Sequence, residues 1–188
     1  MKKTILLCFL LTIFYNSHSQ ETYPVNGSFD IRPGLIAFTN ANIVISADQT
    51  IIKGTLLIRG RNIEAVGENI SIPKGYRTIN LNGKYIYPSL IDAFTSYGFP
   101  DVPQRNLPFM AGTAATYGLT REQALATITL NVAKILGIDK TTGSLEVGKD
   151  ATLFISKGEA LDMIGNDVEQ AFIRGKNLDL DNLHKQIV

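Results

Sequence analysis

Short apolar runs separated by turn residues dominate the chain between residues 35 and 81. The runs with the length and alternation of β-strands are 35–38, 42–45, 55–58, 62–66 and 77–81. If the third run is extended to Arg59, only Gly60 and Arg61 separate it from the fourth, which is typical of a tight β-hairpin. Two later runs, 151–155 and 168–173, have the same character. Short strands at this spacing predict a sandwich or a barrel.

One helical pattern interrupts the strands, at residues 120–136. Thr120 and Gln123 have the spacing of a capping box, in which each side chain bonds to the backbone amide of the other residue. Apolar residues at spacings of three and four then share one helix face: Leu125, Ile128, Val132 and Ile135. Gly137 is suited to end the helix. The segment 100–110 is rich in proline, so we expect an irregular linker there and a mainly β fold with one principal α-helix.

The first residues have the pattern of a bacterial export signal. Two lysines precede an apolar run at residues 5–15, and a small polar stretch follows. The run is shorter than the about twenty residues that a bilayer span requires. We therefore expect a signal peptide at residues 1–19, a periplasmic or secreted mature chain and no stable membrane span; retention of the run as an uncleaved anchor stays open. Cys8 lies in the run, so cleavage would leave no thiol.

The composition is that of an ordinary globular protein. Of 188 residues, 45% are hydrophobic and 19% are charged, and the formal net charge is +1. The length favours one domain or a compact pair. Basic residues are balanced by acids and spread along the chain, so no basic face is available for a phosphate backbone. We therefore expect no nucleic-acid partner.

Residues 84–98 resemble the first barrel strand of the amidohydrolase superfamily. That strand normally reads G-x-x-x-x-P-G-x-I-D-x-H-x-H and ends in two histidines that bind metal. Here Phe94 and Ser96 stand at the two histidine positions. A phenyl ring has no lone pair to donate, and a hydroxyl alone is a weak ligand. The resemblance therefore implies that the zinc or other divalent metal of the family has no site here, and we expect no cofactor.

Residues 111–138 and 143–153 resemble the carboxyl end of the same proteins, in particular of the imidazolonepropionase-like, secreted branch. Thr152 departs from the pattern, because the family usually has an aspartate there. In this family the segments before and after the catalytic (β/α)8 barrel, or TIM barrel, pair into one composite β-sandwich. The resemblance therefore implies a composite β-sandwich plus a strand-and-helix remnant, with most of the barrel missing.

This resemblance also divides the mature chain into successive parts. We expect an N-terminal extension at 20–34, the N-terminal part of the sandwich with the first barrel strand at 35–98, a junction that replaces the barrel at 99–118, and the last barrel helix with the C-terminal part of the sandwich at 119–188. Since a closed barrel places its last helix near its first strand, we expect this helix to cover Ile86, Leu90 and Ile91.

No catalytic residue can be assigned. Without the leader, His184 is the only histidine, and its polar tail is typical of a surface residue. Asp92 stands beside the two replaced ligands, and the resemblance implies that it shapes the loop; a role as general base stays open. Asp101 and Asp150 are interpreted as turn residues.

Other catalytic and binding motifs fail on their context. Residues 143–150 nearly match the phosphate loop G-x-x-x-x-G-K-[ST], but Asp150 replaces the hydroxyl, and a helix precedes the loop where a strand should stand. No G-x-S-x-G elbow is present for serine catalysis. Five tyrosines could line a sugar or peptide surface, but most of them are interpreted as half-buried sheet and junction residues: Tyr76, Tyr85, Tyr87, Tyr97 and Tyr117.

The sequence thus predicts a non-catalytic, barrel-deleted member of the amidohydrolase family, whose activity is metal-dependent hydrolysis of carbon–nitrogen bonds other than peptide bonds. The alternative is an exported binding or assembly module, since the surface that faced the barrel would be apolar and exposed. A homodimer through an unpaired flank of strand 84–93 follows from this alternative. Hydrolysis completed by the metal ligands of another subunit is a third hypothesis.

Overall fold

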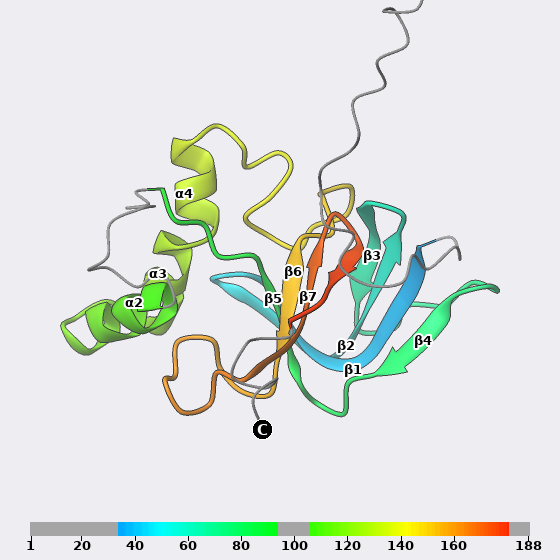
Figure 1. Cartoon of the computed structure of the whole chain (residues 1–188), viewed down its shortest axis with the longest axis horizontal. Helices are drawn as coiled ribbons and strands as arrows, with labels where there is room; N and C mark the ends of the chain where they lie inside the picture. Colours follow the sequence, from blue (N-terminus) through cyan, green and yellow to red (C-terminus); the bar gives the residue numbers. More distant parts are fainter. Residues whose placement is uncertain (1–33, 94–105, 181–188) are drawn as a thin grey trace, which may run out of the picture.

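The computed structural model describes residues 34–93 and 106–180, in which a curved β-sheet has three short helices beside it (Figure 1). The strands are β1 Leu35–Ser46, β2 Gln49–Arg59, β3 Asn62–Gly67, β4 Arg77–Asn80, β5 Tyr85–Pro88, β6 Leu153–Ser156, β7 Val168–Ile173 and β8 Lys176–Leu178. The helices are α2 Leu107–Thr116, α3 Arg121–Thr127 and α4 Leu130–Ile135. The prediction of a mainly β fold is confirmed, and the hairpin predicted at Gly60 joins β2 to β3.

β1 is a long bent strand that joins two of the predicted runs. Its antiparallel pairing with β2 shifts register between Phe38 and Ala41. Asn40, within this shift, has a positive φ of 54°, a conformation that asparagine adopts more readily than most residues. The first half of β1 is parallel to β4 and its second half is parallel to β5. One strand therefore serves both halves of the sheet.

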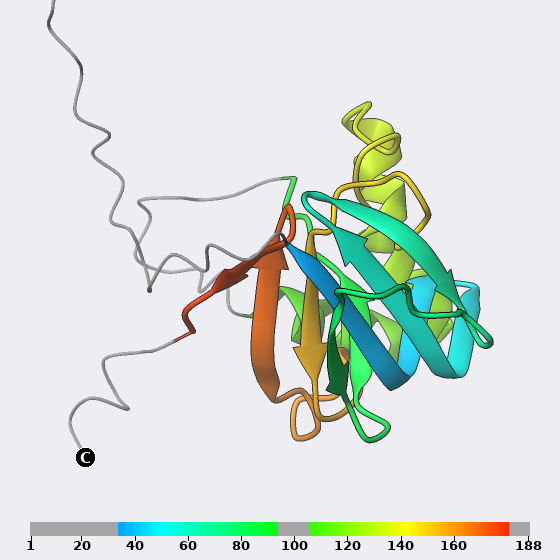
Figure 2. The same ribbon diagram turned by 90° about the vertical axis from the view of Figure 1, so that its right-hand side faces the viewer.

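All strands belong to one eight-stranded mixed sheet in the order β3-β2-β1-β5-β6-β7-β8, with β4 paired to β1 beside this path. The sheet is strongly curved (Figure 2), and the rings of Phe38 in β1 and Phe172 in β7 meet edge to face, 5.4 Å between centroids. The buried core between the two halves includes Ile43, Leu56, Ile58, Ile86, Leu153 and Ile155. The composite sandwich is thus one continuous sheet folded over a core, because the bent β1 belongs to both layers.

β5 lies in the interior of the sheet. Tyr85 and Ile86 pair with β1 on one side and with β6 on the other. The unpaired flank predicted for strand 84–93 is therefore wrong at these positions, because the long β1 extends far enough to cover it. These two residues cannot pair with a second copy through that flank, and the homodimer itself stays a prediction.

The two faces of β5 have different partners, because successive side chains of a strand point to opposite faces. Ile86 lies fully buried in the core of the folded sheet. Tyr85 and Tyr87 instead pack in a second apolar cluster with Ala124 and Leu125 of α3. The prediction that the helix covers Ile86 is therefore wrong.

The segment that follows β5 does contact the helices. Leu90 packs against the second apolar cluster. The Ile91 N–H donates to the carbonyl of Ile128, just after α3, at 2.8 Å. These contacts agree with the predicted docking of a strand-and-helix remnant.

The capping box predicted at the start of the helix is present. The Gln123 N–H donates to Thr120 Oγ1 at 3.1 Å, and the Thr120 N–H donates to Gln123 Oε1 at 2.9 Å. Both bonds satisfy amides that the first helical turn leaves without partners.

The helix itself is shorter than its pattern predicts, because it breaks into α3 and α4. Thr129 lies between them with φ −133° and ψ −103°, and its buried hydroxyl donates to the Leu125 carbonyl at 2.7 Å. A threonine hydroxyl that bonds to a nearby carbonyl competes with the helical bonding pattern. Val132 is buried as predicted, but Ile135 is 82% exposed and not part of a continuous buried face.

α2 occupies part of the segment predicted to be an irregular linker. Pro108 stands in its first turn, where the missing N–H of proline would have no partner in any case. Pro108 and Ala111 are buried. The proline content favoured a linker in the sequence, whereas proline at this position is compatible with a helix.

No helix within residues 34–93 and 106–180 is both long enough and apolar enough to cross a membrane. The predicted signal peptide lies outside the described residues.

Candidate functional site

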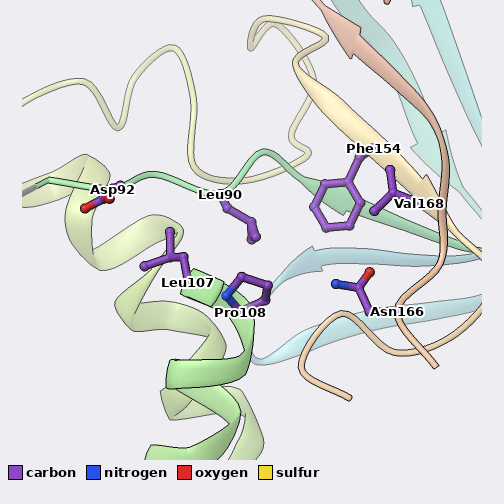
Figure 3. A pocket seen from close by; sticks show the side chains of 7 residues that line it. All are labelled: Leu90, Asp92, Leu107, Pro108, Phe154, Asn166 and Val168. Carbon is purple, nitrogen blue, oxygen red and sulfur yellow. The ribbon is translucent and has the colours of Figure 1, made fainter. Parts of the chain in front are cut away.

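A groove of about 380 Å³ lies beyond the end of β5, and its lining includes Asp92, which in the sequence is two residues before the first position that has a metal ligand in amidohydrolases (Figure 3). Its walls come from the segment after β5, the start of α2, β6, the start of β7 and the loop that leads into β7. The lining residues are Leu90, Asp92, Leu107, Pro108, Phe154, Asn166 and Val168.

Most of this groove is apolar. Leu90, Pro108 and Phe154 lie around its centre, and Asp92 and Asn166 lie at opposite ends (Figure 3). Asp92 is exposed, and Asn166 Oδ1 accepts a hydrogen bond from Ser156 Oγ at 3.3 Å. The groove therefore offers one carboxylate and one amide, with apolar surface between them.

This carboxylate and this amide do not form a ligand set for the divalent metal of the family. A catalytic zinc requires about three protein ligands that converge on one point. Asp92 and Asn166 do not converge, and the described residues contain no group of three or more His, Cys, Asp or Glu side chains that could hold a metal ion. No step of metal-dependent hydrolysis can be derived from the residues of this groove.

Several predicted positions lie outside the described residues. These are Phe94, Ser96, Tyr97, Asp101 and His184. The roles given to them from the sequence stay predictions.

Asp150, interpreted as a turn residue, is a buried carboxylate held between two arginines. Its Oδ1 accepts from Arg61 Nη2 at 3.1 Å, and its Oδ2 accepts from Arg174 Nε at 3.1 Å. The partners are 89 and 24 residues away along the chain, so no local pattern marks them. Asp150 therefore connects the β2–β3 turn with the β7–β8 turn.

The segment 143–150, which nearly matches a phosphate loop, makes its contacts inside the fold. Lys149 is buried, and its Nζ donates to Ser144 Oγ at 2.5 Å and lies 3.4 Å from Glu146 Oε2. The Leu145 N–H donates to the Ile45 carbonyl at 2.8 Å, which fixes the segment against β1. The lysine that would contact a phosphate thus has internal partners.

The tyrosines differ in their surroundings. The Tyr85 and Tyr87 rings stack with 5.8 Å between centroids, and the Tyr76 hydroxyl donates to Glu64. Burial raises the pKa of Tyr87 to about 12, although a hydrogen bond from the Ala160 N–H acts in the opposite direction. Tyr117 is an exception to the half-burial expected of most of these tyrosines: it follows the last residue of α2 and is 88% exposed.

Comparison with known sequences gives partial matches. Residues 89–178 match the model of the amidohydrolase family. The imidazolonepropionase of Pseudomonas fluorescens is 38% identical over 77 residues, which cover 38% of this chain and 19% of that protein. The imidazolonepropionase of Flavobacterium psychrophilum is 34% identical over 89 residues, which cover 44% of this chain and 22% of that protein. The chain thus spans about a fifth of the length of the curated relatives it matches.

Solved structures share the fold. An amidohydrolase from Thermotoga maritima has a TM-score of 0.69 at 14% identity, covering 77% of this chain and 99% of that chain. A putative prolidase from Bifidobacterium longum has a TM-score of 0.54 at 12% identity, covering 77% of this chain and 94% of that chain. At such identities the likeness concerns the fold alone. The sequence matches, which cover less than half of the chain, support membership of the amidohydrolase superfamily.

Proposed function

We propose that this protein is an exported, non-catalytic member of the amidohydrolase superfamily, which retains the composite sheet and its helices. The observation that carries the proposal is the pair Phe94 and Ser96 at the two positions where the family has metal-binding histidines. By resemblance, the activity that is lost is metal-dependent hydrolysis of carbon–nitrogen bonds other than peptide bonds, such as those of cyclic amides. The curated relatives are imidazolonepropionases.

The groove beyond β5 supports the proposal. Activation of a metal-bound water requires a cation held at an open coordination position by several converging ligands. The described lining offers Asp92 and Asn166 at opposite ends of an apolar surface. Asp92 alone can supply a carboxylate but not the electrophile that hydrolysis of an amide requires.

Metal loading tests this proposal. The full chain is expressed, purified and incubated with excess Zn²⁺, and the unbound metal is then removed. We expect substoichiometric zinc and no turnover of imidazolonepropionate, while a full-length imidazolonepropionase treated in parallel retains metal and activity. One tightly held zinc per chain, together with turnover that a chelator abolishes, would contradict the proposal.

The second candidate function is a binding or assembly module. Large apolar side chains are exposed on or beside the helices and in the loop between β6 and β7: Met110, Tyr117, Leu119, Ile135, Leu136, Ile138, Met163 and Ile164. Exposed apolar side chains favour a partner, and all of these belong to the helices, to the residues beside them or to the loop between β6 and β7. This observation supports association through the helical side of the molecule, in place of the strand flank that β1 and β6 occupy.

Light scattering across a range of protein concentrations tests the second candidate. If the protein associates through the helices, its measured mass should exceed that of the monomer. The double substitution Ile135→Ser and Leu136→Ser should return the measured mass to that of the monomer. Ile173→Ser is the matched control, because Ile173 is exposed at the end of β7 and belongs neither to the helices nor to the loop between β6 and β7. A monomer at every concentration would exclude self-association, and an equal effect of the control would exclude the helical surface.

We also propose export to the periplasm or beyond, from the pattern of residues 1–19. Sequencing of the amino terminus of protein from the periplasmic fraction should give Gln20 as the first residue. An intact amino terminus in the membrane fraction would show an uncleaved anchor instead.

A further inference from the structure

A second hollow, of about 430 Å³, shares no lining residue with the groove beyond β5. It lies between the β1–β2 hairpin, β5, the start of α3 and the loop after β6. Apolar and aromatic side chains form much of its wall, and among them are Val44, Ile52, Tyr85, Tyr87, Leu125 and Leu161. Its volume falls within the range of about 300–1,000 Å³ that is common for small-molecule sites.

Charges of both signs line the same hollow. Arg121 forms an ion pair through Nη1 with Glu159, and both side chains are largely exposed. A guanidinium carries five N–H donors, so this single pair does not use its full capacity. Glu122 adds a second carboxylate, and its pKa lies below the ordinary value because its own backbone N–H and the Thr120 hydroxyl bond to it. One cation and two anions therefore stand around an apolar wall.

Tyr87 adds a neutral polar group to the wall. Its hydroxyl accepts a hydrogen bond from the Ala160 N–H, and the charges of Glu159 and Arg121 both act on it. A phenol can donate a hydrogen bond as well as accept one. The Tyr87 hydroxyl could therefore donate to a ligand carboxylate that lies beside the guanidinium. The ring itself remains packed between Tyr85 and Phe154.

We propose that this hollow binds a small zwitterion with an apolar side chain, such as a free aliphatic amino acid. Its carboxylate would lie on the Arg121 guanidinium, its ammonium between Glu122 and Glu159, and its side chain against the apolar wall. A simple anion would meet two carboxylates and a simple cation would meet the guanidinium, so a molecule that carries both charges complements the site best.

Titration of the full isotope-labelled chain with L-leucine, followed by NMR, tests this site. We expect saturable shifts at the lining residues, and at least tenfold weaker binding of N-acetyl-leucine and of leucinamide, each of which lacks one charge. No saturable shift up to the solubility limit of leucine would overturn the proposal. Equal binding of the three compounds would also overturn it, because apolar contact alone would then explain the shifts.

Substitutions in the charged groups locate the site. Arg121→Gln and Glu122→Gln should each weaken leucine binding about tenfold, and Arg121→Lys should have an intermediate effect because it keeps the charge but loses the fork of donors. Lys157→Gln is the control, since Lys157 forms an exposed ion pair with Asp167 outside the hollow. Exposed ion pairs stabilise a fold by at most about 1 kcal/mol, so all four variants should fold. Unchanged affinity in Arg121→Gln, with a native NMR spectrum, would refute the assignment.

Discussion

Arg174 Nε donates a hydrogen bond to Oδ2 of Asp150 at 3.1 Å, which fixes the turn after β7 to the segment before β6. The carboxylate is 9% exposed, whereas the Arg174 side chain is 62% exposed. The same carboxylate accepts from Arg61 on its other oxygen. A single buried acid thus holds two turns that are distant in the sequence.

Loss of this acid should destabilise the fold more than loss of either arginine. Asp150→Asn should lower the free energy of unfolding by about 2 kcal/mol, because the charge-assisted bonds from two arginines to a buried group are weakened. Arg61→Gln and Arg174→Gln should each cost about 1 kcal/mol or less, since their guanidinium groups remain partly hydrated. Urea unfolding measures these differences.

The control for this comparison is Asp167→Asn, which removes the exposed partner of Lys157. Its effect should stay within about 0.5 kcal/mol. An equal loss of stability in Asp150→Asn and in this control would show that Asp150 is a simple turn residue after all.

Two glycines with left-handed backbone test the close contact of the same turns. Gly60 and Gly175 have φ of +59° and +73°, but a Cβ on Gly60 would meet open space, whereas a Cβ on Gly175 would lie 1.9 Å from the Gly60 carbonyl oxygen. Gly60→Ala should cost about 1–2 kcal/mol from the backbone conformation alone. Gly175→Ala should cost a further 1–3 kcal/mol, roughly, because the two turns must separate. Thermal unfolding of both variants gives the difference, and equal midpoints would contradict the close contact.

A buried isoleucine in β5 and an exposed isoleucine in α4 can be compared by truncating each side chain to alanine. Ile86→Ala should lower the free energy of unfolding by about 2–5 kcal/mol, because it leaves a cavity in the core of the folded sheet. Ile135→Ala should change it by less than about 0.5 kcal/mol, because this side chain is exposed. A large loss in Ile135→Ala would instead indicate that a continuous helix buries this residue, as the sequence pattern predicts.

Tyr87 gives the fold a dependence on alkaline pH. Its pKa in the folded state is about 12, above the ordinary value of about 10 for an unfolded chain. Between these values the unfolded state releases the phenol proton first, so the free energy of unfolding should fall as pH rises from about 10 to about 12. Below about pH 10 the protonation of Tyr87 should make no difference to stability.

Absorbance of tyrosinate during alkaline titration measures this effect. Tyr87→Phe should remove the transition near pH 12 and should reduce the fall in stability over the same interval. Since Tyr85 stacks on the same ring, Tyr85→Phe serves as the control, and it should leave the late transition in place. A late transition that persists in Tyr87→Phe would assign it to another tyrosine.

Much of the local structure could be predicted from the sequence. The β2–β3 hairpin follows from Gly60, and the start of α3 follows from the spacing of Thr120 and Gln123, because both depend on residues close together in the chain. α2 was missed because Pro108 can end a helix or stand in its first turn, and composition does not separate these two cases. The break at Thr129 was missed because a spacing of three and four continues across it.

For the candidate site, the sequence located the region but not its surroundings. Asp92 lies in the groove beyond β5, at the position that the resemblance indicates. Asn166 and Val168 could not be connected with it, because they belong to β7 and the loop before it and reach the groove only through the pairing of β5 with β6 and of β6 with β7. The role of Asp150 was missed because its two arginine partners are also distant in the sequence.

The amino-acid sequence by itself indicated the family resemblance, most of the strands, the hairpin turn and the helix cap, since each depends on residue types at short spacings. Only the tertiary structure decided that β5 buries Ile86 in the sheet and turns Tyr87 toward α3, and that Asp150 has two arginines as partners. The physical reason is that an apolar or charged side chain specifies the kind of environment it requires, whereas the chain topology decides which distant residues provide it.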